Sequence, residues 1–158
     1  MSPSVLGFFF GAPALGYFAG NFISGRFSVR IGVNTMVLWG CWLNAIGVGL
    51  SILVMWAGLG SPITFFGFMT FVGLGNGMSI PNATAGALSV RPHLAGTASG
   101  LSGSIMLGGG AGLSALAGAL LGPETGAMPL LYLMVLTGVL GVLAIQVVIW
   151  RERQLGMQ

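Results

Sequence analysis

Charged side chains are nearly absent from this chain, and they stand between long apolar runs rather than within them. The 158 residues include five Lys or Arg and two Asp or Glu, while 55% are hydrophobic. A soluble domain needs far more polar surface to face water, so the bilayer must be the solvent for most of the chain. The runs are apolar on all sides, whereas a spanning strand would alternate. The sequence therefore predicts an all-α membrane protein.

Five apolar stretches have the length of about 20 residues that a spanning helix requires. They predict one transmembrane helical bundle over residues 1–150 and a cytoplasmic tail at 151–158, with spans at about 4–24, 33–57, 62–89, 94–121 and 128–150. The only cysteine, Cys41, lies inside a span, so an intramolecular disulfide is excluded. We expect no cofactor and no metal site, because the sequence has neither a phosphate-binding loop nor a set of metal-ligating residues.

The basic residues occupy alternate connections between the spans. They are Arg26 and Arg30 in the first, Arg91 and His93 in the third, and Arg151 and Arg153 after the last span, whereas the fourth connection has Glu124. The positive-inside rule places the basic connections and the C-terminus in the cytoplasm and the N-terminus outside. This use of the arginines argues against nucleic-acid binding. An outside N-terminus with nothing before it to carry it across indicates a piece of a longer protein.

Small residues follow one face of the fourth span. In lipid, helices associate through such residues because they let two backbones come close. We therefore expect this face to pack against another helix, either statically or as a gliding interface between two halves of a transporter; its glycines are Gly96, Gly100, Gly103, Gly110 and Gly118. The second and fifth spans are rich in large apolar residues, so we expect them at the periphery.

Polar side chains at helical spacing mark the first and third spans. Tyr17 and Asn21 belong to an aromatic and polar stripe of the first span, and Asn76 and Ser79 lie on one stripe of the third. These four residues are candidates for one wall of a solute pathway. The alternative is that they fill the core and that Asn76 makes a hydrogen bond between helices, since an amide at membrane depth faces protein or water.

The third span contains a proline close to its cytoplasmic end. Pro81 lacks a backbone N–H and tends to kink a helix, so it predicts a hinge. Asn82 follows it directly and can satisfy backbone groups that the kink frees, because lipid offers those groups no partner.

Two segments carry a resemblance to a known family. They are "GAPALGYFAGNFISGRFSVRIGVNTMVLWG" at 11–40 and "GNGMSIPNATAGALSVRPHLAGTASGLSG" at 75–103. Together they resemble the C-terminal half of a major facilitator superfamily transporter, with the greatest likeness to drug:proton antiporters of the bicyclomycin and chloramphenicol resistance type. A full member has twelve spans, so the resemblance implies that the N-terminal half and one further span are missing. It also implies a bacterial inner membrane, with a hydrophobic drug and a proton as partners.

The resemblance extends to a cytoplasmic loop motif. "GNFISGRFSVRIG" is similar to the weaker second copy of that motif, a glycine-rich helix end followed by spaced basic residues; the matching residues are Gly20, Gly25, Arg26, Arg30 and Gly32. Gly25 stands where the stronger copy has an aspartate. This departure puts a charge relay in doubt, and the two arginines then only fix the topology.

Proton coupling requires an ionisable group at membrane depth, and the five spans contain no carboxylate or histidine. The fragment alone should therefore not pump, and the alternative function is a membrane remnant or helix-packing module without activity of its own. We expect no enzyme. Ser102 in a protease-like "GLSGS" lies nine residues after His93, about 13 Å along one helix and beyond hydrogen-bond reach.

Overall fold

A computed structural model describes residues 3–122 and 125–156, and these residues are helical or connecting, with no strand among them. Five long helices and one short turn of 3-10 helix follow in the order α1 Pro3–Ile31, α2 Val33–Trp56, α3 Pro62–Ser89, η1 Pro92–Leu94, α4 Ala95–Leu120 and α5 Met128–Gln154. The prediction of an all-α chain is confirmed. Four segments are long and apolar enough to cross a membrane, namely α2, α3, η1 with α4, and α5. For α1, a crossing stays a prediction.

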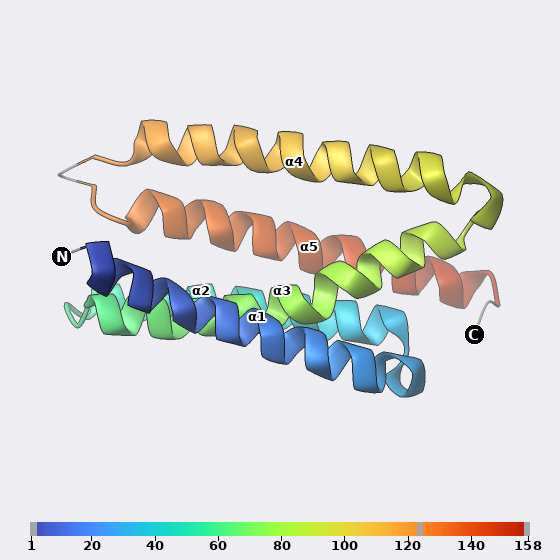
Figure 1. Cartoon of the computed structure of the whole chain (residues 1–158), viewed down its shortest axis with the longest axis horizontal. Helices are drawn as coiled ribbons and strands as arrows, with labels where there is room; N and C mark the ends of the chain where they lie inside the picture. The colour runs from blue at the N-terminus through green and yellow to red at the C-terminus, as the bar shows by residue number, and fades with distance from the viewer. Residues whose placement is uncertain (1–2, 123–124, 157–158) are drawn as a thin grey trace.

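The helices run alternately in opposite directions along one long axis (Figure 1). The N-terminus therefore lies at one end of the bundle and the C-terminus at the other (Figure 1). The connections α1–α2 and α3–α4 share the C-terminal end, as the alternating arginines predict for one membrane face. Glu124, predicted for the opposite face, lies outside the described residues.

Local sequence explains two of the helix boundaries. The Ser61 hydroxyl oxygen accepts a hydrogen bond from the backbone amide of Thr64, and the Thr64 hydroxyl oxygen accepts one from the backbone amide of Ser61, so a capping box followed by Pro62 starts α3. Gly32, with a φ of 97°, is the single residue between α1 and α2. A side chain there would be strained, so glycine permits the reversal.

Helix α3 is the centre of the bundle, with α1 and α2 packed along it and α5 packed against α2. Glycines make both α3 interfaces close. A Cβ at Gly77 would lie 2.8 Å from the Asn21 amide nitrogen of α1, and a Cβ at Gly47 of α2 would lie 2.9 Å from Cβ of Phe71. Backbone contact of this kind is the usual means of helix association in lipid.

The expected peripheral position is wrong for α2. This helix has as many buried residues as α3, from Met36 near its start to Ile52 near its end. Its other face bears Trp39 and Trp42, each about half exposed. The large apolar residues therefore lie on an exposed face of α2, whereas glycines on the opposite side of the same helix bring it against α3.

Helix α4 stands apart from the other helices. Among its described residues only Ala117 is buried. A Cβ built at each of its predicted packing glycines, Gly96, Gly100, Gly103, Gly110 and Gly118, meets nothing within 4 Å. No described helix of this chain therefore packs on that small-residue face, and its packing stays a prediction about a partner.

Two segments that were predicted to lie outside the spans are helical. Helix α1 continues past the expected end of the first span to Ile31, so Arg26 and Arg30 lie on its last turns rather than in a loop. Helix α5 continues to Gln154 and includes the first half of the predicted tail. Long basic side chains at a helix end can reach the interface, so the helix need not stop where the hydrocarbon does.

Candidate functional site

An amide pair joins α2 and α3 at the middle of both helices. The Asn44 side chain donates through Nδ2 to Oδ1 of Asn76 over 2.9 Å. Asn44 is central in Val33–Trp56 and Asn76 in Pro62–Ser89, so the pair lies at mid-depth of the bundle. The sequence left two roles open for Asn76, and the structure places it in a helix-to-helix hydrogen bond. In lipid such a bond contributes about 1 kcal/mol.

Asn44 was missed by the sequence analysis. A signal was present, because Gly40, Asn44, Gly47 and Ser51 recur at the spacing of one helix face. Gly40 and Gly47 approach α3 backbone and Asn44 bonds Asn76 of α3, while Ser51 is 1% exposed. The face was overlooked because bulky residues surround it in the sequence.

A cavity of about 300 Å³ lies beside the amide pair, between α2, α3 and α5. Its lining contains no charged residue; the members are Cys41, Asn44, Val48, Val72, Asn76, Met134, Thr137, Gly138 and Gly141. The cavity adjoins the apolar core of the bundle, whose buried members are Val48, Ile52, Met69 and Leu131. A pair of polar side chains thus lies beside the apolar core of the bundle.

Several hydrogen-bonding groups around the cavity keep unused capacity. Asn76 receives the bond from Asn44, but its own Nδ2 donates to no described residue. Oδ1 of Asn44 is buried without a hydrogen-bond partner and lies against Gly75. Thr137 donates to the carbonyls of Leu133 and Met134 in its own helix, and its hydroxyl oxygen remains free to accept.

The four predicted pathway residues do not come together. Asn76 alone lines the cavity. Ser79 is 8% exposed and lies against Gly40 of α2. On the other side of α3, Asn21 donates to the carbonyl of Tyr17 within α1 over 2.9 Å, and Tyr17 itself is 42% exposed. Helix α3 therefore separates Tyr17 and Asn21 from Asn76 and Ser79.

A second polar contact ties α1 to α3 near the predicted hinge. Asn82 donates to Oγ of Ser24 and to the carbonyl of Met78, each over 2.7 Å, and both side chains are buried. Helix α3 is continuous through Pro81, and its second half bends away from α1 toward the start of α4 (Figure 1). Asn82 thus bonds a backbone carbonyl beside the bend and fixes this part of α3 to α1. A hinge at Pro81 stays a prediction.

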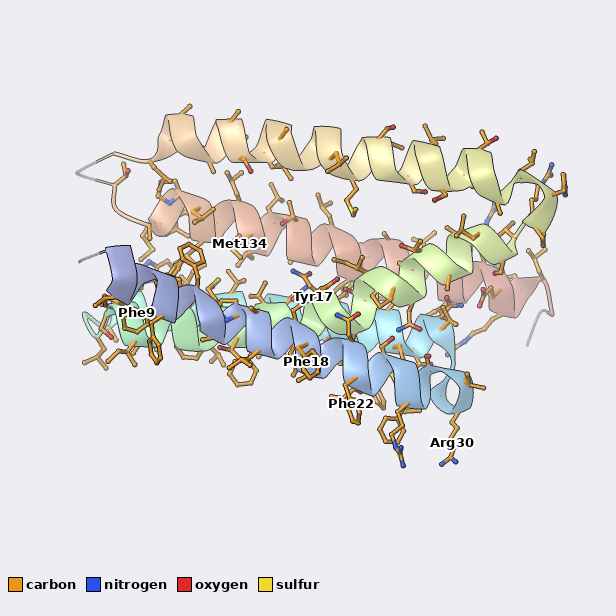
Figure 2. All side chains as sticks on the ribbon, in the orientation of Figure 1. Phe9, Tyr17, Phe18, Phe22, Arg30 and Met134 are labelled. Atoms are coloured by element: carbon orange, nitrogen blue, oxygen red, sulfur yellow. The ribbon has the colours of Figure 1, made fainter. Side chains whose placement is uncertain are left out.

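The basic residues gather at one end of the bundle and are exposed: Arg26, Arg30, Arg91, Arg151 and Arg153. Figure 2 shows Arg30 extending away from the helices. Glu152 accepts a hydrogen bond from Asn34 over 2.5 Å, which joins the start of α2 to the end of α5.

The glycines of the predicted loop motif have different roles. Gly20 is buried against the backbone of Gly77, Gly32 makes the turn, and Gly25 is exposed with nothing within 4 Å of a Cβ. The motif is thus divided between helix packing, a turn and a charged helix end. A relay through Gly25 has no side chain to use.

Among the described residues, no three His, Cys, Asp or Glu side chains come together to hold a metal ion. No family model, curated protein or solved structure matches the chain. The likeness to major facilitator transporters therefore depends only on the residues quoted above.

Proposed function

We propose that this chain is the C-terminal part of a proton-coupled multidrug efflux transporter of the major facilitator type, in a bacterial inner membrane. Its N-terminus lies outside and its C-terminus in the cytoplasm. The bundle contributes one wall of a solute pathway, and the whole transporter works by alternating access. The missing N-terminal half supplies the other wall.

The unpartnered face of α4 is the observation that carries this proposal. Three helices of the chain are joined through glycines at backbone distance, whereas the glycines of α4 have nothing beside them. Small residues allow another helix to approach closely, and a helix that faces only lipid does not require them. The face of α4 is therefore the interface with the other half of the transporter.

The solute wall lies on the side of α1 that bears Tyr17. Figure 2 shows Phe18 and Phe22 on the side of α1 away from α5, whereas Tyr17 lies on the opposite side. A half-exposed tyrosine offers an aromatic surface and one hydroxyl to a hydrophobic drug. Asn21 uses one of its two amide N–H groups within α1, which reduces what it can offer a solute, so we take Tyr17 as the main polar contact of this wall.

The proton-coupling group belongs to the missing half. The membrane-spanning parts of the described helices contain arginines at the ends of α1 and α5 but no carboxylate or histidine at mid-depth. Arginine stays protonated in proteins, so it cannot load and release a proton. Coupling therefore requires a carboxylate in a span outside this chain.

The test is drug efflux by the protein encoded when the reading frame is extended upstream. We expect further spans with a carboxylate in an early one, resistance to chloramphenicol, and ethidium efflux that a protonophore abolishes. Tyr17→Ala should lower that efflux about tenfold by removing a binding contact, whereas Phe18→Ala, on the opposite side of α1, should leave it unchanged.

Two outcomes would contradict the proposal. One is a genuine start site at Met1 with no upstream extension, which supports a membrane remnant or packing module. The other is proton-driven ethidium transport by this chain alone in proteoliposomes, because the chain would then contain the coupling group.

A further inference from the structure

We propose that the cavity between α2, α3 and α5 is a binding site for a small uncharged molecule with a hydrogen-bond acceptor, such as a ketone or an amide, on an apolar body. The site lies on the opposite side of α3 from Tyr17, and binding at this site does not require transport. It therefore goes beyond the function proposed above.

Asn76 provides the recognition. Its carbonyl oxygen is held by Asn44 over 2.9 Å, which fixes the side chain, while its Nδ2 donates to no described residue. Asn76 lines the cavity and is only partly buried, and its nitrogen is not among the enclosed unpartnered atoms, so the free N–H groups keep exposed surface that a ligand can reach. A donor with no partner in an apolar interior favours a ligand that supplies an acceptor.

The rest of the lining selects an apolar and neutral body. Val48, Val72 and Met134 form the walls. No charged residue lines the cavity, so an ion would lose its hydration without gaining a counter-charge. The volume of about 300 Å³ matches the lower end of small-molecule sites, which excludes a large drug.

Glycines on α5 keep the cavity open toward α2. A Cβ at Gly138 would lie 3.7 Å from Cα of Ala45, and a Cβ at Gly141 would lie 3.5 Å from Sγ of Cys41. Both distances allow ordinary contact, so close helix packing does not require glycine there. A methyl group would fit at either position, so the absent side chains add a small amount of space to this wall of the cavity.

The ligand reaches the site from the lipid. A smaller apolar groove of about 130 Å³ lies between α4 and α5, and its lining includes Leu113, Ala117 and Leu133. Met134 and Thr137 line both spaces, so they separate the groove from the cavity. Methionine is flexible and can move aside for a molecule dissolved in the bilayer.

Methionine methyl NMR tests the proposal on the full chain in lipid nanodiscs. Acetophenone is the probe, and α-methylstyrene, which replaces its carbonyl oxygen with a methylene group, is the control. At matched membrane concentrations we expect a saturable shift of the Met134 methyl signal with acetophenone, at an affinity about tenfold higher than with α-methylstyrene. Met106, exposed on α4, should not shift.

Two variants separate the roles of the donor and the space. Asn76→Leu removes the donor and should abolish the preference for acetophenone, and Val72→Phe fills the cavity while both asparagines remain, so it should abolish the Met134 shift. Equal affinities for the two probes, a shift that survives Val72→Phe, or no saturable shift at all would overturn the proposal; the last result means that the cavity holds water only.

Discussion

Individual glycines decide which helices of this bundle touch. Gly73 and Gly77 of α3 meet the backbone of α1, and Gly75 meets the backbone of α2. Gly73 and Gly77 are four residues apart and share one side of α3, whereas Gly75 is two residues from each and points to another side. A single segment of α3 thus binds a helix on each side, which explains its central place.

Replacing Gly77 by alanine should destabilise the bundle. The added Cβ would clash with the carbonyl of Tyr17 and lie 2.8 Å from the Asn21 amide nitrogen, and backbone cannot move aside as a flexible side chain can. We expect a loss of about 1–3 kcal/mol in the free energy of unfolding, measured by denaturant titration in mixed micelles. Gly103→Ala is the matched control and should be neutral, because its Cβ meets nothing. Equal effects of the two substitutions would refute this packing.

Polar residues at mid-depth were only partly predictable. Asn76 was recognised from the sequence because an amide is unusual in a span, and a hydrogen bond between helices was one of its two expected roles. Ser79 was grouped with it but is enclosed against Gly40. Asn76 and Ser79 differ because the helical spacing shows which face of α3 a residue lies on but not which neighbouring helix covers that position.

Helices α3 and α4 are similar in composition but differ in how closely they pack against the rest of the chain. Both are rich in small residues, yet α3 is enclosed by two neighbours, whereas α4 contacts the rest of the chain sparsely. In α3 the small residues do bring two neighbouring helices to backbone distance. For α4 they identify a face whose partner is not another helix of this chain.

Amide hydrogen exchange in detergent micelles should distinguish these helices. We expect the central amides of α4 to exchange at least about tenfold faster than those of α3, because local opening of α4 breaks few tertiary contacts. Helix α2, packed on α3 and α5, serves as the protected reference in the same spectrum. Equal protection of α3 and α4 would show that α4 is held by contacts absent from this structure.

For the whole molecule, the arginines and the helix directions give one orientation. The α1–α2 and α3–α4 connections and the C-terminus share one end of the bundle, and the basic residues lie there (Figure 1). A cationic end on the cytoplasmic side agrees with the positive-inside rule. The orientation itself stays a prediction.

Cysteine accessibility tests that orientation. In a Cys41→Ser background, Val29→Cys and His93→Cys should react with a membrane-impermeant maleimide only from the cytoplasmic side, whereas Leu59→Cys should react only from outside. All three positions are exposed, so a difference in labelling reports the side of the membrane. Inverted vesicles should reverse the pattern. Labelling of positions 29 and 93 from opposite sides would refute the arrangement.

The sequence by itself determined the solvent, the helices and the polar candidates. An apolar run of spanning length must form a helix in lipid, because its backbone groups have to bond to one another, and charged residues are costly in the hydrocarbon. Both properties depend on short stretches of sequence, so they can be predicted without the tertiary structure. Only the tertiary structure decided which glycines meet backbone, that Asn44 pairs with Asn76, and that Tyr17 and Asn76 lie on opposite sides of α3. These facts depend on the rotation of each helix about its axis, which is set by its neighbours and is not encoded in any one segment.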